Sequence, residues 1–95
     1  MITNNLLLKL KERNSENITK TRDVLLSMQG KIEPLLDVKV EVDIRQGASS
    51  YDIMLITKFN SMEDFDAYLV HPVHVEVSKY VGSVVETGAA VCYES

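Results

Sequence analysis

The chain has 95 residues and a formal net charge of −4, with 45% hydrophobic and 25% charged residues, a composition that predicts one ordinary globular domain over residues 1–95. Its single cysteine excludes an internal disulfide, and no segment concentrates the basic residues that a nucleic-acid binder needs. No secretory signal or long apolar run is present, so we expect a cytoplasmic protein without a membrane or nucleic-acid partner.

The first third of the chain predicts a strand followed by a helix. Residues 2–11 alternate between apolar and polar side chains, and Leu7 adds an apolar residue to the polar side, which favours a strand inside a sheet. Asn14 and the residues after it provide helix-capping chemistry, and Gly30 is predicted to end the helix, which spans about four turns. Its expected buried stripe recurs at intervals of three and four residues: Ile18, Thr21, Leu25, Met28 and Ile32.

Two strands are predicted in the middle of the chain. Residues 36–45 alternate strictly between apolar and charged side chains, a pattern typical of an edge strand with one buried face. The expected buried face contains Leu36, Val38, Val40, Val42 and Ile44. After a loop rich in turn residues, residues 51–59 are apolar on both sides, which predicts a central strand.

The last third predicts a helix, an ambiguous segment and a final strand. Ser61 and Asp64 resemble a capping box, and Pro72 biases the residue before it away from helical geometry, so a helix is expected to end near Val70. Its expected buried stripe is Met62, Phe65 and Leu69. Residues 73–84 fit a strand and a helix equally well, and residues 86–93 predict the closing strand.

This order is β-α-β-β-α-β, which predicts an α+β, ferredoxin-like fold with a four-stranded antiparallel sheet and helices on one face. Leu7, Met54 and Ile56 are then expected to point away from the helices. A single copy would leave this apolar face in water, so we predict that a second copy covers it in a homodimer.

Residues 68–74 have the sequence Tyr68-Leu69-Val70-His71-Pro72-Val73-His74. This segment is similar to the Tyr-x-x-His-Pro-x-His signature of the stress-responsive A/B barrel domain (Dabb) family, which the chain resembles over nearly its whole length. Further similarities are found at residues 7–11, 29–32, 50–53 and 91–94. The resemblance implies a dimeric α+β barrel, and it implies that the ambiguous segment after Pro72 is a helix.

The resemblance also suggests site residues. In the family's polyketide cyclases, the tyrosine and the second histidine of the signature act as acid and base, and they correspond to Tyr68 and His74 here. Many members also carry a histidine in the first strand, where this chain has Asn4. We therefore name Tyr68 and His74 as candidate catalytic residues, and Asn4 and His71 as candidate ligand-binding residues.

Structural roles compete with each of these assignments. His71 can cap the turn that Pro72 enforces, and His74 can be a core histidine whose nitrogens are satisfied. Two histidines without a third ligand at a recognisable spacing predict no metal site, and no phosphate-binding or dinucleotide fingerprint predicts a cofactor. The leading hypothesis is a non-enzymatic or weakly ligand-binding homodimer of undetermined activity, in which any ligand is small and apolar and lies between sheet and helices. The alternatives are a cofactor-independent enzyme, polyketide-cyclase-like or monooxygenase-like, and a structural stress-associated oligomer.

Overall fold

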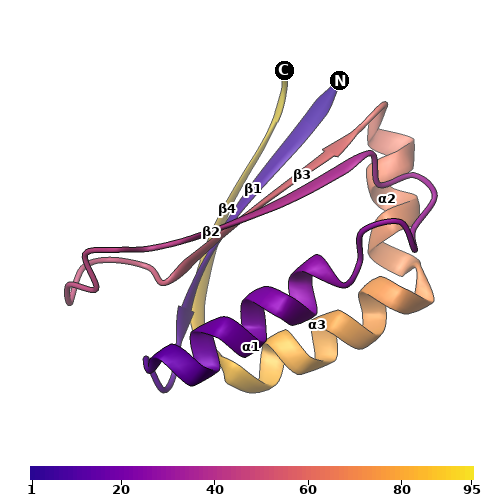
Figure 1. The fold of residues 1–95 in the computed structure, drawn as a ribbon. Coiled ribbons are helices and arrows are strands. Elements are labelled where there is room, and N and C mark those ends of the chain that lie inside the picture. The colour runs from indigo at the N-terminus through magenta and orange to yellow at the C-terminus, as the bar shows by residue number, and fades with distance from the viewer.

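The computed structural model describes residues 1–95 and places three helices on one face of a four-stranded antiparallel sheet (Figure 1). Along the chain the elements are β1 (Ile2–Leu10), α1 (Ser15–Leu26), β2 (Asp37–Val42), β3 (Ile53–Phe59), α2 (Met62–Val70), α3 (Pro72–Val84) and β4 (Val85–Glu94). The strand order in the sheet is β2-β3-β1-β4. The ferredoxin-like fold is therefore confirmed, and the segment after Pro72 is the helix that the family resemblance implied. None of the helices has the length and apolar character of a membrane span.

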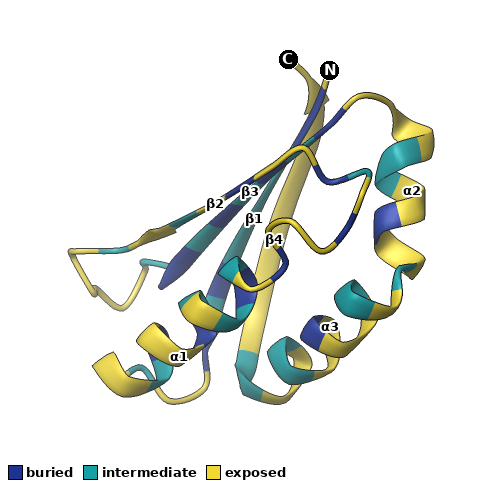
Figure 2. Ribbon diagram, turned by 45° about the vertical axis from the view of Figure 1, so that its right-hand side comes forward, coloured by how far each residue is buried: buried dark blue, intermediate teal, exposed yellow.

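The core lies between the sheet and the helices. Side chains at alternate positions of β1 and β3 point into it, and the two strands pair so that Leu6 lies opposite Leu55. All five residues of the stripe predicted for the first helix are buried, three in α1 and two in the turns that follow it: Ile18, Thr21, Leu25, Met28 and Ile32. Figure 2 shows this pattern as dark segments on the inner sides of the central strands and helices.

The other face of the sheet has no helix over it. Leu7 of β1 lies opposite Met54 of β3, and both belong to this face, as the alternation predicted. The edge strand β4 is exposed along nearly its whole length (Figure 2), including Val91 at 65% and Tyr93 at 43% exposure. The helix-free face therefore presents apolar side chains from three adjacent strands.

Helix α1 ends earlier than the sequence predicted. The helix stops at Leu26, and the N–H groups of Met28, Gln29 and Lys31 then donate to carbonyls three residues earlier, over 3.1–3.3 Å. Gly30 adopts a left-handed φ of 77° in these turns, a conformation that costs glycine little. The tighter turns keep the predicted stripe buried although the regular helix has ended.

Two predicted apolar stripes are corrected by the structure. Of the stripe predicted over residues 36–45, only Val38 is buried, and Ile44, beyond the end of β2, is 94% exposed, because the β2–β3 hairpin projects beyond the helices (Figure 1). In α2, Met62 and Leu69 are exposed, and Tyr68 is buried in their place. The Tyr68 ring packs 5.0 Å from that of Phe59, centroid to centroid, so aromatic packing sets the rotation of this helix.

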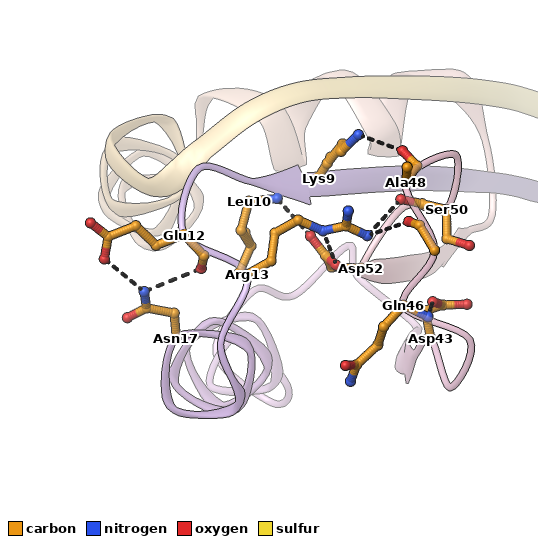
Figure 3. A network of polar contacts seen from close by, with 11 residues as sticks. Lys9, Leu10, Glu12, Arg13, Asn17, Asp43, Gln46, Ala48, Ser50 and Asp52 are labelled. Atoms are coloured by element: carbon orange, nitrogen blue, oxygen red, sulfur yellow. Dashed lines mark hydrogen bonds and ion pairs between the residues drawn. The ribbon is translucent and has the colours of Figure 1, made fainter.

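A buried ion pair ties the base of the β2–β3 hairpin to the end of β1 (Figure 3). Asp52 is 1% exposed, and its carboxylate accepts hydrogen bonds from the Leu10 N–H at 2.8 Å and from Arg13 Nε at 2.9 Å. The Arg13 guanidinium also donates to the carbonyls of Gly47 and Ser50, at 3.0 Å each. The sequence gives no sign of this cluster, because its members come from two segments, residues 10–13 and 47–52, that lie far apart along the chain.

Candidate functional site

A pocket of about 230 Å³ lies between the sheet and the three helices. Eight of its eleven lining residues are hydrophobic. The lining consists of Asn4, Leu6, Leu25, Met28, Leu55, Tyr68, Leu69, His74, Val77, Ser78 and Val81. Three of the four site residues singled out in the sequence, Asn4, Tyr68 and His74, thus meet in one pocket. A larger hollow of about 700 Å³ on the outer side of α1 contains none of them.

Tyr68 is held on the inner side of α2. Its ring centroid lies 4.4 Å from that of His74, and its hydroxyl lies 3.8 Å from the Met28 sulfur, which is a weak acceptor. Burial raises the pKa of Tyr68 to about 12, since the phenolate would be poorly solvated there. The hydroxyl therefore stays protonated at neutral pH and is a hydrogen-bond donor at the wall of the pocket.

His74 lies in the first turns of α3 and is half-buried. Its Nδ1 lies 3.0 Å from the carbonyl oxygen of Leu69, one of the carbonyls that the end of α2 leaves without a helical partner. Because a carbonyl only accepts, this bond assigns the proton of the ring to Nδ1 and leaves the lone pair of Nε2 free. Burial lowers the pKa of His74, and the bond to Leu69 opposes part of that effect. The ring is thus a neutral base near pH 7.

Asn4 and Ser78 complete the polar lining. Asn4 lies on β1 and contributes an amide from the sheet side. Ser78 lies one helical turn after His74 and was not predicted from the sequence. Both Ser78 and His74 also line a second hollow that includes Lys79, so these two residues stand between the inner pocket and the surface.

His71 lies outside the pocket. It is the N-cap of α3, where its Nδ1 accepts a hydrogen bond from the Val73 N–H at 3.1 Å, and Pro72 is the first residue of the helix. This arrangement matches the capping role that competed with ligand binding in the sequence. No three His, Cys, Asp or Glu side chains lie together in a group that would hold a metal ion.

The arrangement provides two kinds of chemistry. Apolar walls with a few polar groups are typical of sites that bind small molecules. In addition, a neutral imidazole and a protonated phenol lie in contact, which is the pairing that general acid–base catalysis uses. The volume of about 230 Å³ lies below the roughly 300–1,000 Å³ of pockets for drug-sized ligands, so a ligand that fits is small.

Comparison with known proteins locates this fold among its relatives. The family model of the stress responsive A/B barrel domain, Dabb, matches residues 2–95, and no curated protein sequence matches the chain. The structure is similar to that of a dimeric protein of unknown function from Bacteroides fragilis, with 23% identity, a TM-score of 0.85, and coverage of 99% of this chain and 95% of that one.

Two further solved structures share the fold. One is a dimeric ferredoxin-like protein of unknown function from Thermobifida fusca, with 18% identity and a TM-score of 0.86, covering 99% of this chain and 90% of that one. The other is a hydroxynitrile lyase from Passiflora edulis, with 15% identity and a TM-score of 0.83, covering 97% and 90%. At these identities the likeness establishes the fold alone.

Proposed function

Because the chain belongs to the stress responsive A/B barrel domain family, we propose that it is a homodimer that binds a small, largely apolar molecule between its sheet and its helices. The pocket is the observation that carries this proposal. Eight hydrophobic residues form its walls, and Asn4, His74 and Ser78 provide polar groups. Such a lining binds the body of a ligand by apolar contact and orients it by a small number of hydrogen bonds.

The homodimer is supported by the helix-free face of the sheet. This face carries apolar side chains from three strands: Leu7, Met54, Ile56, Ala89, Val91 and Tyr93. A standard interface buries roughly 600–1,000 Å² on each copy, a modest part of the 5749 Å² that this chain exposes. The relatives from Bacteroides fragilis and Thermobifida fusca are described as dimeric, which supports the same assembly here.

The ligand site is tested by titrating methyl-labelled protein with a library of neutral fragments of small size and following the methyl resonances by NMR. We expect fragments to shift the resonances of Leu25, Leu55 and Val77, which line or border the pocket. Val81→Phe adds a ring to the lining and is expected to abolish these shifts. Val70→Phe, at a position that is 76% exposed and outside the pocket, is the matched control. Fragments that bind both variants equally would contradict the proposal.

The contact between His74 and Tyr68 supports a second candidate, a cofactor-independent enzyme that acts on a hydrogen next to a carbonyl group. In this reaction His74 Nε2 would take the proton as the carbon–hydrogen bond breaks, and the Tyr68 hydroxyl would donate a hydrogen bond to the developing enolate oxygen. A hydroxynitrile lyase shares the fold. Asn4 argues against cyclase chemistry, because an amide does not transfer protons as the family's histidine does.

The second candidate is separated from simple binding by hydrogen–deuterium exchange of cyclohexanone in D₂O, since exchange requires a proton to leave and a deuteron to return. We expect binding without accelerated exchange. Acceleration by the parent protein that is lost in both His74→Asn and Tyr68→Phe would establish the enzyme instead. Tyr68→Phe removes only the hydroxyl and keeps the ring that packs against Phe59.

A further inference from the structure

Each of the two central strands carries one polar residue in the row of side chains that faces the helices. In β1 the row contains Asn4 among Ile2, Leu6, Leu8 and Leu10. In β3 it contains Thr57 among Ile53, Leu55 and Phe59. The two interruptions meet, because Asn4 lies directly opposite Thr57 in the register of the sheet.

Thr57 is a buried polar residue without a hydrogen-bond partner. The residue is 1% exposed, and its Oγ1 has no hydrogen-bond partner within the chain. The only other buried side-chain atom in this condition, Asn5 Oδ1, belongs to the next position of β1 and so to the helix-free face. Most buried hydroxyl groups in folded proteins are paired, and valine would fill the same space without a polar atom. A threonine at this position thus points to a hydrogen-bonding partner.

Asn4, Leu6 and Leu55 line the pocket, and Thr57 lies beside them on the sheet, buried just outside the lining. Cross-strand neighbours have Cβ atoms roughly 4.5–5.5 Å apart, so a group bound at Asn4 lies close to Thr57. No Lys, Arg, Asp or Glu lines the pocket, so a charged group there would remain uncompensated.

We propose that Asn4 and Thr57 form a polar subsite on the pocket floor that binds a neutral hydroxyl or carbonyl group of a small, otherwise apolar ligand. This inference rests on the proposed ligand-binding function and adds the class of ligand to it. The amide of Asn4 offers both donors and an acceptor, and the hydroxyl of Thr57 offers one donor and two acceptors. The subsite therefore accepts alcohols and ketones and discriminates against hydrocarbons and carboxylates.

The test compares the affinities of cyclohexanol, cyclohexane and cyclohexanecarboxylate for the parent protein and three variants by NMR titration. We expect cyclohexanol to bind the parent about fivefold more tightly than cyclohexane, the ratio that one net hydrogen bond gives, and the carboxylate to bind most weakly. Thr57→Val and Asn4→Leu are expected to bring the ratio of the cyclohexanol and cyclohexane affinities to about one. Ser78→Ala, which deletes the hydroxyl of another lining residue, shows whether that group gives the preference instead.

The possible outcomes distinguish a failure of the subsite from a failure of the whole ligand pocket. If neither neutral probe binds the parent, the proposed ligand site fails, and the subsite fails with it. If both bind but the ratio is the same in the parent and in Thr57→Val, the pocket stands and the subsite is overturned. A ratio that only Ser78→Ala lowers would overturn it as well. If Thr57→Val raises the melting temperature and leaves the ratio unchanged, the threonine holds at most a water molecule, which also overturns the proposal.

Discussion

At the scale of single residues, the state of His74 follows from where α2 ends. The last carbonyls of a helix need partners outside it, and here the Leu69 carbonyl finds one in the ring nitrogen Nδ1 of His74. The same bond that completes the helix end therefore fixes which nitrogen carries the proton. A structural role and a functional role of His74 do not exclude each other, because the structural bond uses Nδ1 and leaves the lone pair of Nε2 free.

We predict that His74 makes the folded protein less stable in mild acid. Burial lowers the pKa of His74 below its ordinary value of 6.5, so the unfolded chain binds a proton first as the pH falls. The stability from the neutral ring is complete above about pH 6.5 and is lost as the pH falls through the lower pKa of the folded state. Urea unfolding of the parent and of His74→Asn, at equal protein concentration, measures this.

The expected result is that the stability advantage of the parent over His74→Asn shrinks as the pH falls from about 7.5 to about 5. Asparagine offers an N–H group near the place of Nδ1 but does not titrate. His71 is present in both proteins, so any contribution from it cancels in the difference. An advantage that stays constant or grows in acid would show that the ring is not held neutral.

The sequence predicts the place of some site residues and not of others. The spacing of Tyr68 and His74 in the motif brought both to the pocket, because they flank the corner between two helices. His71 belongs to the same motif but caps α3, since the residue before Pro72 occupies the N-cap position. Thr57 could not be recognised as a site residue from the sequence. Its proposed role depends on the register between β1 and β3, which pairs it with Asn4. Alternation within one strand does not determine that register.

At the scale of elements, the periodicity of apolar residues predicted which side chains share a face more reliably than whether another element buries that face. The stripe predicted for the first helix is buried at every position, because α1 and the turns after it lie along the sheet. The alternation over residues 36–45 was equally regular, yet Ile44, which follows β2, is exposed, since the hairpin extends past the helices. In α2, Tyr68 is buried in place of the predicted Leu69, because packing of its ring against that of Phe59 sets the rotation of the helix more strongly than the hydropathy pattern does.

The Asp52–Arg13 pair joins the end of β1 to the loop between β2 and β3. We predict that Asp52→Asn lowers the free energy of unfolding by about 3 kcal/mol. Removing one partner leaves the Arg13 guanidinium with its charge unpaired and the Leu10 N–H with a weaker acceptor. The control is Asp23→Asn, whose carboxylate pairs with Arg22 on the surface and is expected to change stability by less than about 1 kcal/mol. Urea unfolding at neutral pH measures both, and equal losses in the two variants would contradict the prediction.

At the scale of the whole molecule, the two faces of the sheet have different surroundings. One face is covered by the helices and contains the pocket, whereas the other presents apolar side chains from β1, β3 and β4. The charged side chains of the helix-free face lie on the edge strand β2, at Asp37, Lys39 and Glu41, and near the ends of the central strands, at Lys9 and Lys58. An apolar region bordered by charges fits an interface with a polar rim. The second copy that we propose would cover this region.

We predict that Leu7→Glu or Met54→Lys converts the dimer to monomers. Either change places a charge in the middle of the helix-free face, where a second copy would have to bury it without a partner. Sedimentation equilibrium at micromolar concentration is expected to give twice the 10.7 kDa of one chain for the parent, and 10.7 kDa for the variants that remain folded by circular dichroism. Val70→Glu adds a charge on the helical side, at a residue that is 76% exposed, and is expected to stay dimeric. A parent that sediments as a single 10.7 kDa species, or a Met54→Lys variant that stays dimeric, would show that this face is not the interface.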